Sequence, residues 1–135
     1  MIRTIREVLS RWLGNNNDRD KKAQSKGGAV FKQIETVDAI LEASQGAKVM
    51  VLKHSTTCPI SDRARREVES LMAEKTETAV YLVVVQQQRD ISNEIEEKLG
   101  VRHESPQLLL IQDGSVTQHW SHHQITHESA AEALN

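Results

Sequence analysis

The sequence predicts an α/β fold in which a mixed β-sheet is flanked by helices on both faces. Strand and helix patterns alternate along the first part of the domain, and such alternation requires parallel strands joined by right-handed crossovers. An Asp113-Gly114 pair then separates two further strand patterns, which is a strong signal for an antiparallel hairpin. A sheet that is parallel at first and antiparallel at its end satisfies both observations.

The composition indicates a soluble, single-domain protein. The 135 residues, 38% of them hydrophobic and 27% charged, are enough to build one core. One cysteine cannot form an internal disulfide, which excludes the disulfide-rich secreted class. No apolar run approaches the roughly 18 residues of a membrane span, and no signal peptide is recognisable. We therefore expect a cytoplasmic protein.

Charge is distributed unevenly along the chain. Residues 1–28 hold seven Lys and Arg against three Asp and Glu, a net charge of +4. Residues 29–135 hold ten against sixteen, a net charge of −6. Because an acidic body repels phosphate backbones, we expect no nucleic-acid partner.

Residues 1–14 have the pattern of an amphipathic helix that ends at Gly14, and residues 15–28 read as a polar linker. The apolar face has three possible partners: the protein's own domain or a second copy, a different protein, or an anionic membrane surface. The sequence favours the first and leaves the others open. The apolar face comprises Ile2, Ile5, Val8, Leu9, Trp12 and Leu13.

Residues 29–135 read as one domain, which begins with a short strand at Val30–Ile34. Thr36 is suited to cap the following helix, which Gly46 closes. The next strand, Lys48–His54, is a continuous apolar run that is typical of burial on both faces.

A long helix is expected after Cys58, because its apolar residues recur three and four positions apart. Thr78–Val85 follows as a continuous β-branched run, which predicts the central strand. Asp90 is the expected cap of a helix that ends at Gly100. The apolar stripe of the long helix comprises Ile60, Ala64, Val68, Leu71 and Met72.

The last elements are the hairpin and a short helix. Gln107–Gln112 and Val116–Ser121 are its strands, joined through the Asp113-Gly114 turn. Thr126 then caps a helix that runs through Leu134.

Cys58 lies between a buried strand and the long helix, and Pro59 follows it at a position suited to the first helical turn. A sulfur there meets unpaired N–H groups and the positive end of the helix macrodipole, which both favour the thiolate. The thiolate is the nucleophilic form of cysteine. The alternative is an inert, buried cysteine, but the polar residues before Cys58 disfavour it. We therefore predict a reactive thiol.

Three hydroxyl residues flank the cysteine. Thr56, Thr57 and Ser61 could each donate a hydrogen bond to the thiolate or cap the helix, and capping is the commoner role for a threonine such as Thr57.

Charged and imidazole side chains near Cys58 have two interpretations. Lys53, Arg63 and Arg66 could bind the carboxylates of a thiol cofactor, but an ordinary solvated surface is favoured. His54 could act as a base, although an exposed loop position is favoured.

Four further histidines gather near the end of the hairpin. Strand residues alternate faces and no helical histidine pair is present, so a solvated or capping cluster is favoured over a Zn or Ni site, and no metal is expected. Trp120 is expected to pack in the core. The four histidines are His119, His122, His123 and His127.

The chain resembles the monothiol bacilliredoxin (YtxJ-like) family of the thioredoxin-like superfamily in its order of elements and in three motifs. These are Thr57-Cys58-Pro59-Ile60-Ser61, Trp120-Ser121-His122 and Ile125-Thr126. The resemblance extends from about Phe31 to Leu134. Ser61 stands where related proteins have the second cysteine of a CxxC motif.

The resemblance also implies a cis peptide bond before Pro106, in a loop that faces Cys58. The backbone of Ser105 could there bind an extended substrate segment by strand addition. A trans proline at the start of an edge strand is the alternative.

The family implies that bacillithiol is the thiol co-substrate and that S-bacillithiolated proteins are the clients. From the residues alone, a thiolate that attacks a disulfide forms a mixed disulfide, which Ser61 cannot resolve. An external thiol must therefore regenerate Cys58. Two other hypotheses stay open: a monothiol glutaredoxin-like protein, although Pro59 departs from the CGFS motif of that family, and a non-catalytic adaptor that acts through residues 1–14.

Overall fold

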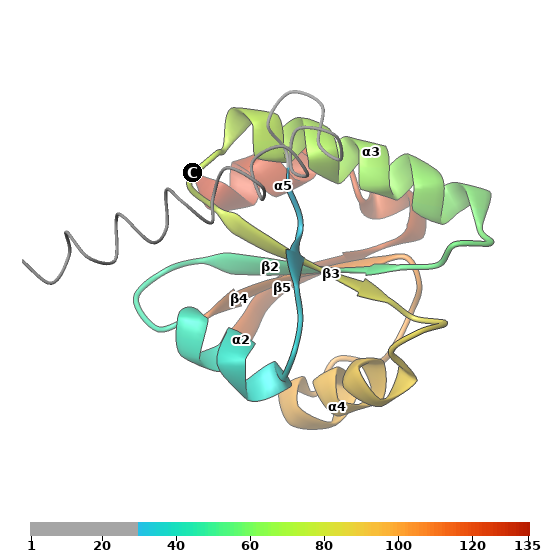
Figure 1. The fold of residues 1–135 in the computed structure, drawn as a ribbon. Helices are drawn as coiled ribbons and strands as arrows, with labels where there is room; N and C mark the ends of the chain where they lie inside the picture. The colour runs from blue at the N-terminus through green and yellow to red at the C-terminus, as the bar shows by residue number, and fades with distance from the viewer. Residues whose placement is uncertain (1–29) are drawn as a thin grey trace, which may run out of the picture.

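The computed structural model describes residues 30–135, so the predicted helix at 1–14 and linker at 15–28 lie outside the described residues. Figure 1 shows a central sheet with α3 and α5 on one face and α2 and α4 on the other. In chain order the elements are β1 (Lys32–Gln33), α2 (Val37–Ala43), β2 (Val49–His54), α3 (Pro59–Glu74), β3 (Ala79–Val84), α4 (Arg89–Leu99), β4 (Gln107–Gln112), β5 (Ser115–Ser121), the 3-10 helix η2 (His122–Gln124) and α5 (His127–Leu134).

The five strands form one mixed sheet in the order β1-β3-β2-β4-β5. β1, β3 and β2 are parallel, while β4 is antiparallel to both β2 and β5. The predicted α/β fold is therefore confirmed. The prediction that Thr78–Val85 is the central strand is wrong, because β2 occupies the centre and all six of its residues are buried. β3 has only the two-residue β1 on its outer side.

Several predicted helix ends agree with the structure, and others differ. Thr36 and Thr126 cap α2 and α5, each accepting a backbone N–H bond of 3.1 Å on its hydroxyl. Gln88 rather than Asp90 is the N-cap of α4, and Asp90 lies in the first turn, where a carboxylate complements the helix macrodipole. Helix α2 ends at Ala43 with Ser44 as its C-cap, before the predicted Gly46.

Each face of the sheet has its own hydrophobic core. Alternate residues of β2 divide between them, because successive strand side chains point to opposite faces. Met50 and Leu52 pack with α3 and α5, whereas Val49 and Val51 pack with α2 and α4. Trp120 joins the first core, as expected from the sequence. Within residues 30–135, no helix combines the length and apolar character needed to cross a bilayer.

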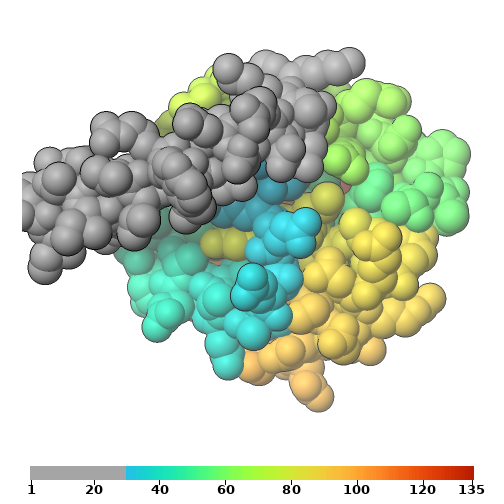
Figure 2. Space-filling view, viewed as in Figure 1, coloured from blue at the N-terminus to red at the C-terminus, as the bar shows by residue number. Residues whose placement is uncertain are grey.

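The helices on the second face are joined by a surface ion pair. Figure 2 shows the segment of α2 beside that of α4, and Lys98 Nζ lies 2.7 Å from Asp38 Oδ1 between them. Glu96 of α4 also accepts a bond of 3.2 Å from His103 N–H, which connects this helix to the loop that leads to β4.

Gly100 ends α4 with a left-handed backbone (φ 73°, ψ 20°), and its N–H bonds to Glu96 O at 2.9 Å. We expect Gly100→Ala to lower the free energy of unfolding by about 1 kcal/mol, since a Cβ is unfavourable in this conformation. Nothing lies within 4 Å of the added Cβ, so the cost is conformational. Gly100→Asn should cost less, because asparagine tolerates positive φ. Urea unfolding measures both, and equal costs for the two variants would contradict this explanation.

Candidate active site around Cys58

Cys58 lies at the carboxyl end of the sheet, where β2 passes into α3. It is the N-cap of α3 with an extended backbone (φ −113°, ψ 120°), and Pro59 occupies the first helical position. The residue is partly exposed and forms no disulfide. The sequence predicted this placement, because Pro59 can begin a helix without a backbone donor.

The start of α3 stabilises the thiolate form of Cys58. Hydrogen bonding from the backbone N–H of Ser61 is the main cause that lowers the pKa of the Cys58 thiol, and Ile60 N–H and the Ser61 hydroxyl act in the same direction. Partial burial opposes them. A sulfur surrounded by helix-start donors is a nucleophile, and its exposure leaves it accessible to a disulfide.

Ser61 holds the position three residues after the cysteine and is fully buried. Its hydroxyl oxygen accepts a bond of 3.2 Å from Ser55 N–H, while the hydroxyl proton is available to the sulfur. Ser61 therefore connects the loop before Cys58 to the helix after it.

We expect Ser61→Ala to raise the pKa of the Cys58 thiol, because the variant loses one donor to the thiolate. The rate of alkylation near neutral pH should fall by about threefold, in line with one modest hydrogen bond. The pH dependence of alkylation measures this effect. Ser115→Ala, at an exposed position of β5, is the control. An unchanged profile in Ser61→Ala would contradict the role of the hydroxyl.

The two threonines before Cys58 support the loop. Cys58, not Thr57, occupies the N-cap position of α3, and its side chain makes no cap hydrogen bond. The Thr57 hydroxyl lies 3.3 Å from Ser55 Oγ. Thr56 contributes its backbone N–H, which bonds to Gln86 Oε1 at 3.3 Å.

The loop before β4 carries the Ser105-Pro106 bond, which is cis. Because Lys53 pairs with Gln107 in the antiparallel register, Pro106 lies beside the end of β2, near the loop that carries Cys58. Pro106 O accepts a bond of 3.0 Å from His122 N–H. Ser105 Oγ is buried and has no hydrogen-bond partner among the described residues.

Two residues of β2 differ from their predicted setting. Lys53 is fully buried rather than solvated, and its side chain faces α4, with Nζ 3.2 Å from His103 Nδ1. Burial lowers the pKa of Lys53 to about 8, and Glu96 opposes this. His54 is also buried, at 4% exposure, rather than exposed in a loop. Burial and then Arg65 lower the pKa of His54. Its position at the end of an interior strand accounts for the difference.

The remaining candidate residues do not converge on the cysteine. Arg63 is exposed, and Arg66 forms an exposed pair with Asp62 at 3.6 Å. The histidines near the hairpin separate, since His122 lies 3.3 Å from Glu104 and His127 contacts Glu74 and Ser70 on α3. Within residues 30–135, no three His, Cys, Asp or Glu side chains are grouped as a metal site would require.

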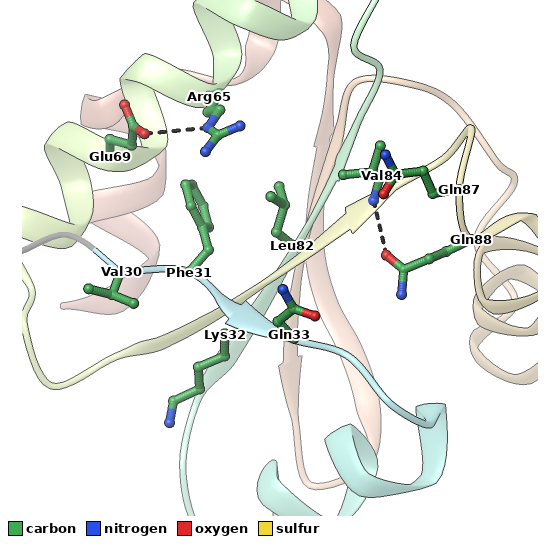
Figure 3. A pocket seen from close by; sticks show the side chains of 10 residues that line it. All are labelled: Val30, Phe31, Lys32, Gln33, Arg65, Glu69, Leu82, Val84, Gln87 and Gln88. Carbon is green, nitrogen blue, oxygen red and sulfur yellow. Dashed lines mark hydrogen bonds and ion pairs between the residues drawn. The ribbon is translucent and has the colours of Figure 1, made fainter. Parts of the chain in front are cut away.

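A cavity of about 440 Å³ lies beside β1, between α3 and the end of β3. Figure 3 shows Arg65 bonded to Glu69 and placed above Phe31; the guanidinium carbon is 5.3 Å from the ring centroid. Cys58 does not line this cavity.

Gln86 is a part of the site that the sequence analysis missed. It follows β3, and its side-chain amide contacts the loop between β2 and Cys58. The sequence could have indicated this contact only through the strand order, because neighbouring parallel strands bring the loops at their carboxyl ends together.

Comparison with known proteins agrees with this geometry. The family model described as monothiol bacilliredoxin BrxC matches residues 30–130. A solved structure named as a candidate oxidoreductase with a thioredoxin fold is 33% identical, covers 81% of this chain and 97% of its own, and has a TM-score of 0.72. The thioredoxin of Fasciola hepatica is 17% identical, covering 77% of this chain and 96% of its own with a TM-score of 0.62, and shares the fold.

Proposed function

Since the chain belongs to the monothiol bacilliredoxin family, we propose that it removes bacillithiol from S-bacillithiolated proteins through the Cys58 thiolate. The family and the fold are those of thiol–disulfide oxidoreductases. The observation that carries the proposal is the lone cysteine at the start of α3, where backbone donors lower the pKa of its thiol.

The reaction begins with attack of the Cys58 thiolate on the bacillithiol sulfur of the capped client. The new S–S bond joins Cys58 to bacillithiol, and the client–bacillithiol S–S bond breaks. The client leaves as a thiolate and takes a proton from solvent. A lower thiol pKa increases the thiolate fraction of Cys58 near neutral pH, which favours this step.

The second step requires an external thiol. Ser61 has no sulfur with which to attack the mixed disulfide, so the thiolate of free bacillithiol attacks the bound bacillithiol sulfur. This produces bacillithiol disulfide and returns Cys58 as the thiolate. Each step exchanges one S–S bond for another, so no separate oxidant is consumed. A reducing cytoplasm, where thiols persist, suits this cycle.

Client binding is proposed at the loop that precedes β4. Pro106 lies beside the end of β2 through the pairing of Lys53 with Gln107, and the Ser105 backbone is suited to bond an extended client segment by strand addition. Thr56, Thr57 and Pro59 support the loop and helix start that hold the nucleophile.

The test compares two forms of one client protein, capped either with bacillithiol or with glutathione. We expect the reduced protein, with free bacillithiol present, to uncap the bacillithiol form faster, as followed by the mass of the client. Equal rates would overturn bacillithiol selectivity and favour a glutaredoxin-like activity. No uncapping of either form would overturn the proposed transfer.

A further inference from the structure

Gln86 contacts the loop before Cys58 from a different strand. It follows β3, which is parallel to β2 and adjacent to it, so the loops after the two strands lie side by side. The Gln86 side chain therefore reaches a segment that is about thirty residues earlier in the chain.

One side-chain amide bonds three consecutive residues. Gln86 Oε1 accepts from Thr56 N–H at 3.3 Å, and Nε2 lies 2.7 Å from Ser55 Oγ and 3.3 Å from Thr57 Oγ1. A primary amide offers an acceptor and two donors on one planar group, and here both atoms are used. Gln86 therefore holds the residues immediately before the nucleophile.

The loop that Gln86 bonds, Ser55–Thr57, also contacts Ser61, which follows Cys58 in the sequence. Ser55 uses its hydroxyl toward Gln86 and its backbone N–H toward Ser61 Oγ, at 3.2 Å. The N–H and hydroxyl of Ser61 in turn lower the pKa of the Cys58 thiol. A chain of hydrogen bonds thus runs from the turn after β3, through Ser55, to Ser61 at the start of α3, beside the thiol whose pKa it lowers.

We propose that Gln86 is a positioning residue: it fixes Ser55–Thr57 so that the Ser61 hydroxyl and the start of α3 are aligned on the Cys58 sulfur. The inference rests on the proposed function only in taking Cys58 as the reacting group. The side-chain bonds of Gln86 go to Ser55, Thr56 and Thr57, so it acts through the loop and Ser61.

The two neighbouring glutamines have different roles, which provides a matched control. Gln88 accepts from Val84 N–H at 3.3 Å and is the N-cap of α4. Gln87 is exposed and lines the cavity beside β1, whereas the dashed bond in Figure 3 joins Gln88 to Val84. Gln87→Ala therefore removes the same side chain one residue away and should leave the loop before Cys58 unchanged.

The experiment measures the alkylation rate of Cys58 from about pH 5 to about pH 9 in the full chain, a range that spans the titration of a lowered thiol. We expect Gln86→Ala to shift the profile to higher pH and to slow alkylation near neutral pH by about threefold to fivefold. Gln86→Glu should slow it further, because the carboxylate cannot donate to Ser55 and Thr57 and repels the thiolate. Gln87→Ala should match the wild type.

A double variant tests whether Gln86 acts through Ser61. If it does, Gln86→Ala combined with Ser61→Ala should shift the profile little more than Ser61→Ala alone, since coupled residues are not additive. Full additivity would overturn the connection through Ser61. Profiles of Gln86→Ala and Gln86→Glu that superimpose on the wild type would overturn the positioning role. If the Gln86 variants shift the profile as expected while the wild type transfers no bacillithiol, the proposed function is refuted and the role of Gln86 stands.

Discussion

Replacing Cys58 by serine is expected to abolish removal of bacillithiol from a capped client. The rate should fall by about a thousandfold or more, to that of the uncatalysed exchange, because a hydroxyl is protonated near neutral pH and cannot form the mixed disulfide. Cys58 is also the only cysteine in the sequence, so no second thiol can replace it. The release of the client thiol measures the effect.

The stability of Cys58→Ser serves as its control. The residue is partly exposed and makes no disulfide, so its urea unfolding midpoint should change little. Retained client uncapping by the folded variant would show that another group does the chemistry. An adaptor that acts through residues 1–14 should keep its partner binding, and so its function, in Cys58→Ser, whereas an oxidoreductase loses its activity.

The second large effect concerns Lys53. We expect Lys53→Met to raise the free energy of unfolding at neutral pH by about 2 kcal/mol, since an apolar chain of similar length replaces a buried ammonium. Lys53 is fully buried, and its Nζ has His103 Nδ1 at 3.2 Å as its hydrogen-bond partner. An ammonium has three donors, so this pairing compensates only part of the lost hydration. Urea unfolding of both proteins measures the difference.

The gain in Lys53→Met should depend on pH in a defined direction. Burial lowers the pKa of Lys53 from 10.5 to about 8 in the folded protein. Between these values the unfolded chain keeps a proton that the folded chain has lost, so the free energy of unfolding of the wild type rises with pH. The advantage of the methionine variant should therefore be greatest below about pH 8 and shrink toward pH 10.5.

Lys32→Met is the matched control for this prediction. Lys32 lies on the edge strand β1 and is exposed, so removing its charge should change the free energy of unfolding by no more than about 0.5 kcal/mol. A strong decrease in the free energy of unfolding of Lys53→Met at pH 7 would contradict the prediction, because the buried ammonium would then stabilise the fold by more than its desolvation costs.

Local signals were sufficient where the structure depends on nearby residues. The strand Gln107–Gln112 and the helix that Thr126 caps have their predicted bounds. The position of Cys58 at a helix start followed from Pro59, whose ring suits the first turn. The cis bond before Pro106 came from the family resemblance, since a proline alone does not determine its isomer.

Long-range packing decided what the sequence could not predict. A continuous β-branched run indicates burial but carries no information on strand order, so it cannot show that β2 rather than β3 lies at the centre of the sheet. Lys53 and its partner His103 are separated by fifty residues, and a lysine at a strand end normally indicates solvent. Gln86, Gln87 and Gln88 are chemically identical, and only the pairing of β2 with β3 distinguishes the one that bonds the loop before Cys58.

Cys58 itself is proposed to receive the thiol cap, and the mass of the intact protein after a single turnover tests this transfer most directly. Reduced protein is mixed with an equal amount of bacillithiol-capped client and quenched with acid. We predict one bacillithiol on Cys58 for each client uncapped, and its removal when free bacillithiol is added. Uncapped client without an adduct on Cys58, or a disulfide between Cys58 and the client as the main product, would contradict the claim.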